Sequence, residues 1–323
     1  MRMKALVRDR YGLPDVLEVR EVQRPAPQTD EVLVRVHAAS INDWDWGLLQ
    51  SPTIPFLRSA PKPILGSDIA GRVVALGNRV RRVRVGDEVH GDVSRFGAGG
   101  WGGFAEYVCA RERALVLKPA RMTFEQAAAL PQAGQLAVQA LFAAGPLKPG
   151  QRILINGAGG GVGTIGVQLA KTQDVEVTGV DGAAKHEMMR TIGFAHVIDY
   201  RKEDFTRNGQ RYDLIVDTKT THSPFDYARS LTPGGTYATV GGEQMRLLLQ
   251  VPLLGWWIRL ATSKTVRLIA LKQNKDLAYL SERFEAGQLA PVIDGPYRLS
   301  DAPEAFRHFG AGNHQGKVVI TID

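Results

Sequence analysis

The chain reads Asn156-Gly157-Ala158-Gly159-Gly160-Gly161-Val162-Gly163 at the point that decides its fold. This segment joins a short apolar run, Arg152 to Ile155, to a segment of helical periodicity, Val162 to Thr172. If it is a dinucleotide-binding fingerprint, Ala158 takes the first glycine position, Gly160 the second and Gly163 the third. The alternative is a glycine-rich structural turn that binds nothing.

Each position of this turn has a physical role in the binding interpretation. Gly160 lets the backbone approach a pyrophosphate without a Cβ in the way, and Gly163 lets the helix pack tightly on its strand. The helix N-terminus offers free N–H groups and its dipole to the phosphates. The predicted cofactor-binding residues of the turn are therefore Ala158, Gly160, Gly161, Val162 and Gly163.

Strand and helix patterns alternate downstream of the turn. Apolar runs are followed by turns or by helical segments such as Lys185 to Ile192, which predicts a doubly wound parallel sheet covered on both faces. Gly241-Gly242 ends the fifth of these strands, where the backbone is expected to pass near a nicotinamide; a plain turn is the alternative. The strand-like runs are Arg152 to Ile155, Val175 to Val180, His196 to Ile198, Leu214 to Val216 and Tyr237 to Val240.

The regions on either side differ from this centre. About the first 120 residues have strand-like alternation with Gly and Pro punctuation, and helical periodicity begins near Met122, broken by Pro131 and Gly134. The tail after Thr262 is too small to be a domain, with a turn expected around Gly295-Pro296. We therefore predict a β-rich substrate domain from residues 1–121 and 265–323, and a nucleotide-binding domain from residues 122–264.

Composition limits the remaining possibilities. The 323 residues include one cysteine, Cys109, so neither an intrachain disulfide nor a thiolate zinc cluster can form within the chain. The N-terminus has no apolar stretch of signal-peptide length, and we expect a cytoplasmic protein. The net charge of +7 permits attraction to anions, but the basic residues are dispersed.

The most apolar later segment runs from Val251 to Leu260 and contains Trp256-Trp257. It is too short and too interrupted to span a bilayer. Packing in the core or in a pocket is the favoured interpretation of the tryptophan pair. A dimer contact and contact with a membrane surface are the alternatives.

Three residues bear on which nicotinamide cofactor is bound. Asp181 ends the second strand, where an acidic group accepts from a ribose 2′-hydroxyl and favours NAD. Lys185 and Tyr200 are expected to face the same ribose, and a lysine there would hold a 2′-phosphate. Asp181 as a helix cap, and Lys185 and Tyr200 as exposed side chains, are the alternatives.

Motifs along nearly the whole chain resemble the zinc-free quinone oxidoreductase branch of the medium-chain dehydrogenase/reductases. The resemblance implies a Rossmann-type sheet with a β-rich GroES-like catalytic domain, and a homodimer. The motifs that carry it are Ala39-Ser40-Ile41-Asn42-Asp43-Trp44-Asp45, Leu65-Gly66-Ser67-Asp68-Ile69-Ala70-Gly71, Val85-Gly86-Asp87-Glu88-Val89, Gly103-Phe104-Ala105-Glu106-Tyr107, Val197-Ile198-Asp199-Tyr200 and Gly316-Lys317-Val318-Val319.

Differences from zinc-dependent relatives place the chain in this branch. Those relatives have a cysteine near Ser40 to Asn42 and a His-Glu pair where this chain has Ser67-Asp68. They also supply a third ligand where Gln132-Ala133-Gly134 stands, and a four-cysteine lobe that is missing here. Catalytic zinc needs about three protein ligands in a fixed array. The sequence therefore predicts an enzyme without a metal.

The resemblance also implies the cofactor and the site residues. NADPH is the hydride donor it favours, with NADH possible, because Lys185 and Tyr200 match positions that contact the 2′-phosphate. Asp181 and Leu136 depart from residues usual in the branch. Asn42 and Asp45 resemble the polar pair of the catalytic cleft; turn stabilisation is their alternative.

The acceptor is expected to be flat and easily reduced. Trp44, Trp46 and Trp101 form an aromatic wall in this hypothesis, and ordinary core packing is the alternative. Without a Lewis acid the acceptor must be a quinone or another conjugated carbonyl. Reduction of an enone, 2-alkenal or enoyl thioester double bond is the second hypothesis, and non-catalytic nucleotide or RNA binding is the third. Dispersed charge disfavours nucleic acid as a partner.

Overall fold

The computed structural model describes residues 1–51, 63–94, 101–242 and 244–323, and these form two compact units. Unit 1 comprises Met1–Ala133, Gln273–Glu285 and Pro291–Asp323. Unit 2 comprises Gly134–Lys272 and Ala286–Ala290. The C-terminal segment of the chain thus completes the N-terminal unit.

A six-stranded parallel sheet forms the centre of unit 2. Its strands lie in the order β10-β9-β8-β11-β12-β13, which is the arrangement of a Rossmann fold. After β8 the chain adds β9 and β10 on one side of the sheet, and it then returns to add β11, β12 and β13 on the other side. The point between β8 and β11 is therefore a topological switch point, where open α/β sheets bind ligands. The strands are β8 (Arg152–Asn156), β9 (Glu176–Asp181), β10 (His196–Asp199), β11 (Tyr212–Asp217), β12 (Leu231–Thr239) and β13 (Thr265–Leu268).

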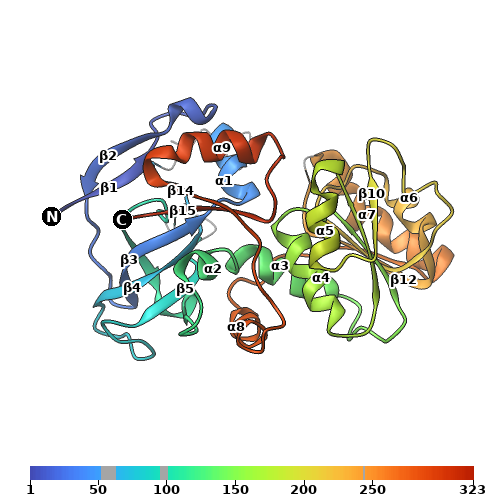
Figure 1. Cartoon of the computed structure of the whole chain (residues 1–323), viewed down its shortest axis with the longest axis horizontal. Coiled ribbons are helices and arrows are strands. Elements are labelled where there is room, and N and C mark those ends of the chain that lie inside the picture. The colour runs from blue at the N-terminus through green and yellow to red at the C-terminus, as the bar shows by residue number, and fades with distance from the viewer. Residues whose placement is uncertain (52–62, 95–100, 243) are drawn as a thin grey trace. The chain divides into compact units, whose positions relative to one another are not determined.

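Helices cover both faces of this sheet (Figure 1). The helices that follow β8 and β9 lie on one face, and those that follow β11 and β12 lie on the other, because crossovers between parallel strands are right-handed. Apolar side chains from both layers bury the sheet, including Leu154, Ile215 and Tyr237. The helices are α3 (Pro131–Leu141), which begins in unit 1, α4 (Gly161–Lys171), α5 (His186–Ile192), α6 (Pro224–Arg229) and α7 (Met245–Thr262).

Unit 1 is built on a larger, mostly antiparallel sheet. Its strands follow the order β14-β15-β3-β4-β5-β7, and β6 pairs with β3. The last strand, β15, pairs with β3 and brings the chain's end into this sheet. The strands are β3 (Glu31–Ser40), β4 (Asp68–Leu76), β5 (Glu88–Asp92), β6 (Tyr107–Arg111), β7 (Val116–Leu117), β14 (Ile293–Arg298) and β15 (Lys317–Thr321).

The remaining elements of unit 1 flank that sheet. Strands β1 (Arg2–Val7) and β2 (Glu18–Gln23) form a separate antiparallel pair. The core of the unit joins strand residues to α9, whose Phe306 is fully buried against Phe104. The helices are α1 (Asp43–Gln50), α2 (Phe124–Ala128), α8 (Leu277–Glu285) and α9 (Ala302–Gly310).

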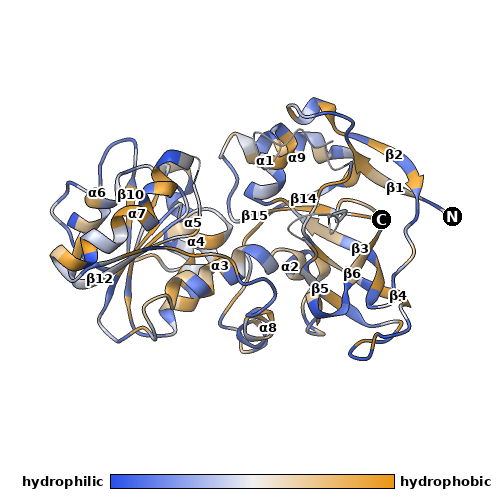
Figure 2. Cartoon of the chain, turned by 180° about the vertical axis from the view of Figure 1, so that it is seen from behind, coloured by the Kyte–Doolittle hydropathy of each residue, from blue (hydrophilic) through white to orange (hydrophobic). Residues whose placement is uncertain are grey.

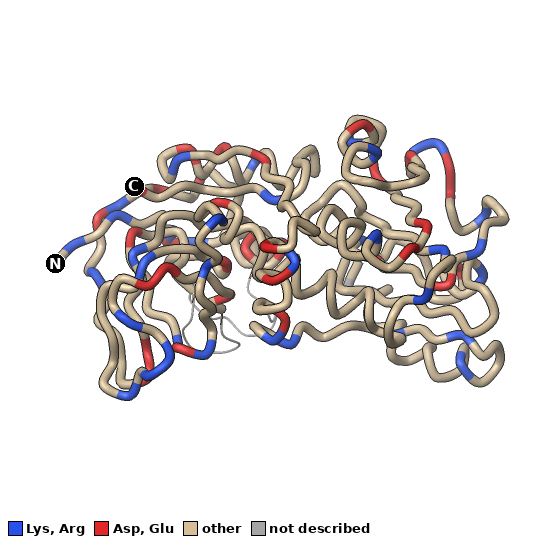
Figure 3. Tube along the Cα trace, turned by 60° about the horizontal axis from the view of Figure 1, so that its bottom comes forward, with Lys and Arg blue, Asp and Glu red and all other residues tan. Residues whose placement is uncertain are grey.

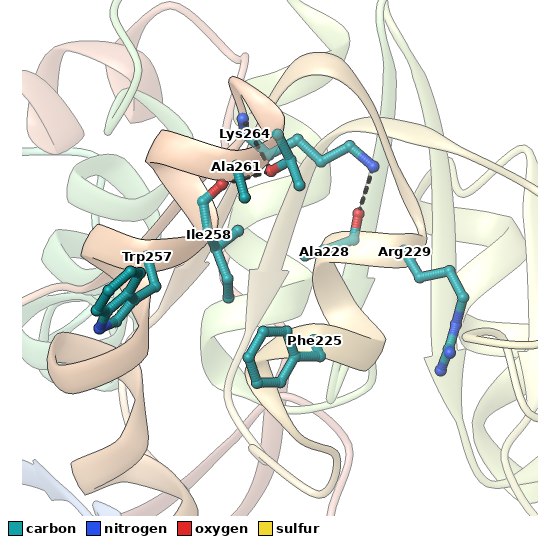
Figure 4. Close-up of a pocket in the computed structure, with 8 residues that line it drawn as sticks. Phe225, Ala228, Arg229, Trp257, Ile258, Ala261 and Lys264 are labelled. Carbon is teal, nitrogen blue, oxygen red and sulfur yellow. Dashed lines mark hydrogen bonds between the residues drawn. The ribbon is translucent and has the colours of Figure 1, made fainter.

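Three local expectations need correction. Gly134 lies within α3 and does not interrupt it, although the break at Pro131 is present. Gly295-Pro296 lies inside β14 at a shift of register, so it is a strand irregularity and not a turn. Trp256 and Trp257 are each 60% exposed on α7, so the core-packing part of the expectation was wrong, whereas Trp257 does line a pocket, beside Phe225 and Ile258 (Figure 4).

Surface charge and hydropathy are distributed differently in the chain. Basic and acidic residues are interspersed over both units, as expected (Figure 3). Hydrophobic residues line the strands and continue along α7 (Figure 2). Within the described part of the chain, no helix is long and apolar enough to cross a membrane.

Candidate cofactor site and buried polar cluster

The glycine-rich turn follows β8 and leads into α4. The Gly157 and Ala158 N–H groups donate to the Val180 carbonyl at 3.0 and 3.1 Å, which ties the turn to the end of β9. A Cβ on Gly163 would lie 2.5 Å from the Ala158 Cα, closer than real Cβ contacts. Gly163 therefore permits the close passage of helix and turn, as the fingerprint predicts.

The first turn of α4 leaves backbone donors available. Gly160 is the N-cap in an extended conformation, and the first helical bond is from the Thr164 N–H to the Gly160 carbonyl at 3.0 Å. The N–H groups of Gly161, Val162 and Gly163 therefore have no acceptor within the helix. Together with the helix dipole they make the start of α4 a candidate anion-binding site at the carboxyl edge of the sheet.

Asp181 ends β9 beside the turn and is already engaged. Its carboxylate accepts from the Gly159 N–H at 2.9 Å and from the Gly182 N–H at 2.8 Å. The Lys185 Nζ lies 3.5 Å from Asp181 Oδ1, the oxygen that accepts from Gly182, and both side chains are largely buried. The negative charge of Asp181 is therefore balanced within the loop, and the residue also braces the turn.

A further cation, Arg201, lies next to Tyr200 in the loop that follows β10. The Tyr200 side chain is exposed, and the Arg201 guanidinium lies over its ring, 4.9 Å from the centroid. A Cβ on Gly182 would lie 2.9 Å from the Arg201 Nη1 and 3.8 Å from the Tyr200 ring. Lys185, Tyr200 and Arg201 thus gather around the end of β9, and the sequence pattern did not predict Arg201.

The switch point between β8 and β11 contains a buried hydrogen-bond network. The Asp217 carboxylate accepts from the Asn156 side-chain amide at 2.9 Å and from the Tyr237 hydroxyl at 2.8 Å. It also accepts the N–H groups of the following turn, including that of Lys219 at 2.8 Å. A Cβ on Gly242 would lie 2.5 Å from the Lys219 carbonyl oxygen, so Gly242 allows the two loops to approach.

Asn42 and Asp45 lie together at the start of α1 in unit 1. Asp45 is fully buried, and its carboxylate accepts from the Asn42 N–H and the Gly66 N–H, both at 2.9 Å. The Asn42 side-chain amide donates to the Ser67 hydroxyl at 3.1 Å. Asp45 therefore fixes both the position of Asn42 and the loop before β4.

A buried lysine at the start of β15 completes this arrangement. The Lys317 Nζ donates to the Ile41 carbonyl at 2.9 Å and to the Asn42 side-chain oxygen, and it lies 3.7 Å from the Asp68 carboxylate. Asp68 also accepts the Gln132 N–H at 3.1 Å. We call Asn42, Asp45, Ser67, Asp68 and Lys317 the Lys317 cluster.

Burial dominates the electrostatics of the Lys317 cluster. Loss of hydration raises the pKa of Asp45 to about 7, although the two backbone N–H groups favour its charged form. Burial likewise raises the pKa of Asp68, and the ammonium of Lys317 opposes that rise. Burial lowers the pKa of Lys317, and the nearby carboxylates oppose this. One cation is thus shared between buried acids.

The three tryptophans of the expected aromatic wall have different environments. Trp44 is 42% exposed, and Trp101 is partly buried against the core of unit 1. Trp46 packs against α9, with its ring centroid 6.5 Å from that of Phe309. For Trp46 these contacts support the alternative interpretation, ordinary core packing. An acceptor-binding role for Trp44 and Trp101 stays a prediction.

Sequence reasoning missed Lys317, Arg201 and Asp217 as members of these sites. Lys317 stands out only as part of a family motif, and nothing near it in sequence indicates that its ammonium meets Asn42. Asp217 directly follows an apolar run, and this position at a strand end was the available signal. In the described residues no group of three or more His, Cys, Asp or Glu side chains is arranged to hold a metal ion.

Comparison with known proteins agrees with this two-part architecture. Residues 28–120 match a family model described as an alcohol dehydrogenase GroES-like domain. Residues 192–320 match a model described as a zinc-binding dehydrogenase. A solved quinone oxidoreductase from Coxiella burnetii superposes with a TM-score of 0.86 at 27% identity, over 100% of both chains.

Curated relatives extend the likeness over the full chain. A chloroplastic quinone-oxidoreductase, QR1, from Triphysaria versicolor is 32% identical over 98% of each chain. A chloroplastic NADPH-dependent alkenal/one oxidoreductase from Arabidopsis thaliana is 30% identical over 98% of this chain and 79% of its own. The protein belongs to the quinone oxidoreductase-like branch of the medium-chain dehydrogenase/reductase family. It is an oxidoreductase with a Rossmann-type unit and a GroES-like unit.

Proposed function

We propose that this protein reduces quinones or other conjugated carbonyl compounds with NADPH and without zinc. The observation that carries the proposal is the glycine-rich turn at the switch point of unit 2, where unpaired N–H groups of α4 face the carboxyl edge of the sheet. The relatives named as a quinone oxidoreductase and an alkenal/one oxidoreductase support the choice of acceptor.

The donor set fits a nicotinamide dinucleotide, which supplies a hydride when bound. Gly161, Val162 and Gly163 would hold the pyrophosphate through their backbone N–H groups. Gly241 and Gly242 keep side chains away from the loop expected beside the nicotinamide. Asn42 is the polar group we assign to the acceptor, and Asp45 and Lys317 act on it as positioning residues through the contacts described.

Metal independence is supported by what stands at the ligand positions. The segments Ser40 to Asn42 and Ser67-Asp68 correspond to ligand positions of zinc-dependent relatives, and here the Lys317 ammonium contacts both. A divalent cation at this point would meet a buried positive charge at short range. We expect full activity in protein stripped with a chelator. Stoichiometric zinc whose removal abolishes turnover would contradict this part of the proposal.

The preferred cofactor follows from the charge at the end of β9. Asp181 is balanced by Lys185 and by two backbone N–H groups, and Arg201 adds a second cation nearby. This environment favours a 2′-phosphate over a bare 2′-hydroxyl. We expect fluorescence titration to give about ten-fold or more tighter binding of NADPH than of NADH.

Arg201→Gln tests this assignment against Arg190→Gln, which removes an exposed arginine on α5. Arg201→Gln is expected to weaken NADPH binding about ten-fold and to leave NADH binding unchanged, since one charge-assisted contact to phosphate is lost. Arg190→Gln should change neither. Tighter binding of NADH by the unaltered protein would make Asp181 the dominant determinant.

The acceptor class is tested by following NADPH oxidation with 1,4-benzoquinone and with 2-hexenal. Turnover of the quinone supports the main proposal, and turnover of the alkenal alone would replace it by double-bond reduction, which the alkenal/one oxidoreductase relative favours as second candidate. Membership in an oxidoreductase family speaks against the non-catalytic RNA-binding hypothesis.

Two further properties belong to this proposal. A homodimer is supported by the outer edge of β13, which ends the sheet of unit 2 and can pair with a second copy. Sedimentation velocity will give the mass in solution. A cytoplasmic location stays an expectation from the sequence, and fractionation of the source cells tests it.

A further inference from the structure

Thr220 has a backbone conformation that L-amino acids rarely adopt. It lies in the loop after β11, and its φ of 47° falls in the left-handed region. A β-branched side chain crowds the backbone there, so this conformation is an outlier and costs conformational energy. Strain of this kind persists only where the surrounding contacts enforce it, and it is concentrated at functional sites. The contacts that hold Thr220 therefore indicate what the strained loop does.

Buried hydrogen bonds hold Thr220 from two sides. Its N–H donates to both oxygens of the Asp217 carboxylate, at 3.1 and 3.2 Å. Its hydroxyl lies 2.7 Å from the Gly241 carbonyl oxygen and 2.7 Å from the Thr239 hydroxyl. The Thr239 hydroxyl in turn lies 2.9 Å from the same carbonyl oxygen. We call the buried residues Asp217, Thr220 and Thr239, together with Gly241, the Thr220 network.

The glycine pair after β12 depends on these hydroxyls for its orientation. Gly241 and Gly242 have φ of 154° and 157°, values that residues with a side chain rarely adopt. Nothing stands within 4 Å of the position that a Cβ on Gly241 would occupy, so side-chain packing does not hold this residue. Glycine also has more backbone freedom than any other residue. The Thr220 and Thr239 hydroxyls therefore limit the orientations of the Gly241 peptide.

The loop after β11 turns its N–H groups inward. Of residues 219–222, the first two donate their N–H groups to the Asp217 carboxylate, and the last two donate to the Tyr227 hydroxyl oxygen at 3.0 and 3.3 Å. The carbonyl of a trans peptide points opposite to its N–H, so the carbonyls of this loop turn the other way. The start of α4 has the reverse polarity and suits a phosphate. A carbonyl-rich loop suits hydroxyl and amide donors.

The order of the strands places this loop beside the second half of a bound dinucleotide. Asp181 and Lys185, the predicted contacts of the adenosine ribose, lie at the end of β9. The predicted pyrophosphate site follows β8, and β11 and β12 lie on the far side of β8 from β9. A dinucleotide that crosses the carboxyl edge in this direction brings its nicotinamide riboside to the loops after β11 and β12.

We propose that Thr220 is a positioning residue for hydride transfer. Its hydroxyl fixes the Gly241 carbonyl, and through it the loop against which the nicotinamide packs. The inference rests on the proposed function, since it takes NADPH as the cofactor. In the reaction the acceptor gains a hydride and then a solvent proton, and the bound NADPH becomes NADP⁺. Without the hydroxyl, the start of α4 still holds the pyrophosphate, but the geometry needed for transfer is held less closely.

Thr220→Val tests this assignment, because valine keeps the β-branched shape and removes the hydroxyl. Its matched control is Thr232→Val, which removes a hydroxyl bonded to Asp213 at 2.8 Å at the other end of β12. We expect Thr220→Val to lower kcat about ten-fold and to change the dissociation constant for NADPH by less than about three-fold. Thr232→Val should change neither quantity. An unaltered kcat in Thr220→Val would overturn the proposal.

Two further measurements separate positioning from a general structural role. With NADPH deuterated at C4, the primary isotope effect on kcat should rise in Thr220→Val, because hydride transfer becomes slow relative to product release. The emission of bound NADPH, which reports the surroundings of the reduced nicotinamide, should shift, whereas the affinity for 2′,5′-ADP, which lacks the nicotinamide, should not change. Equal loss of affinity for NADPH and for 2′,5′-ADP would mean that Thr220 supports the whole cofactor site, and the proposal would be wrong.

Thr220→Ser and Thr220→Gly separate the hydroxyl from the strained conformation. Serine keeps the hydroxyl, so Thr220→Ser should recover most of the turnover that Thr220→Val loses. Glycine adopts the left-handed conformation without strain but has no hydroxyl, so Thr220→Gly should be as slow as Thr220→Val. Full turnover by Thr220→Gly would assign the effect to backbone conformation alone, and the hydroxyl would have no positioning role.

The unaltered protein distinguishes failure of this inference from failure of the proposed function. If it binds NADPH but oxidises it with neither 1,4-benzoquinone nor 2-hexenal, the proposed function is wrong. The emission of NADPH bound to Thr220→Val then still decides whether Thr220 orients the nicotinamide. If the unaltered protein and Thr220→Val turn over equally fast, the proposed function stands and the role of Thr220 is refuted.

Discussion

The glycine-rich turn of unit 2 and the Lys317 cluster of unit 1 stabilise charge in opposite ways. The turn offers backbone N–H groups and a helix dipole, which are fixed partial charges that do not titrate. The Lys317 cluster removes full charges from water and balances them against one another. An anion site made of backbone needs only small side chains, whereas a buried ion cluster depends on every one of its members.

This difference predicts that the turn fails through steric blockage. Gly163→Val places a branched side chain against Ala158, which must move the turn away from α4. We expect the dissociation constant for NADPH to rise at least ~100-fold, because the phosphate-binding N–H groups lose their alignment. Fluorescence titration measures this, and circular dichroism shows whether unit 2 remains folded.

Gly47→Ala is the matched control for that substitution. Gly47 lies in α1, and nothing stands within 4 Å of the position that its Cβ would occupy. The variant should bind NADPH as the unaltered protein does. Full NADPH affinity in folded Gly163→Val would show that the turn does not hold the diphosphate.

The Lys317 cluster is expected to fail through loss of charge balance. Lys317→Met keeps the length of the side chain but leaves Asp68 and Asn42 without the ammonium. Removal of one partner from a buried ion pair costs about 3 kcal/mol in the free energy of unfolding. Urea denaturation will measure that loss, and the exposed Lys4→Met should stay within about 0.5 kcal/mol of the unaltered protein.

The same variant sharpens the comparison between the units. NADPH binding should survive Lys317→Met wherever the protein is folded, because the turn draws nothing from the Lys317 cluster. Turnover should fall, because Asn42 loses the contact that orients its amide. If Lys317→Met and Lys4→Met lowered the free energy of unfolding by the same amount, the buried ion pairs of Lys317 would not stabilise unit 1 as described.

The glycine-rich turn could be predicted from the sequence more completely than the Lys317 cluster. The turn is one continuous segment whose glycines, flanking strand and helix are all readable, so its placement after β8 and before α4 was predicted. The Lys317 cluster joins α1, the start of β4 and the start of β15, which are separated by up to 275 positions in sequence. No local pattern brings these segments together, so Asn42 and Asp45 were predicted but their lysine was not.

Helix α7 shows a second reason why the sequence did not predict every side chain's burial. Apolar periodicity predicts a buried helix, and Val251 and Ile258 are indeed buried. The sequence cannot indicate that only one layer of protein covers such a helix, since that depends on how many elements cross the sheet. Trp256 and Trp257 were therefore assigned to packing in the core or in a pocket; neither lies in the core, and Trp257 lines the pocket between α6 and α7.

The smallest expected effect concerns a buried titratable group of unit 1 that lies outside the Lys317 cluster. His90 of β5 is fully buried, and burial lowers its pKa to about 4, from about 6.5 in the unfolded chain. Between these values the unfolded state binds a proton that the folded state does not. Stability from this group is therefore complete above pH 6.5 and is lost as the pH falls toward 4.

His90→Gln removes this dependence, and His196→Gln provides its counterpart in unit 2, where the side chain is exposed. Between pH 6 and pH 5, the unaltered protein should lose up to about 1.4 kcal/mol of unfolding free energy more than His90→Gln loses. His196→Gln should follow the unaltered protein. If the unfolding free energies of the unaltered protein, His90→Gln and His196→Gln had the same pH dependence, His90 would bind its proton in the folded state as readily as in the unfolded chain. Burial would then not lower the pKa of His90.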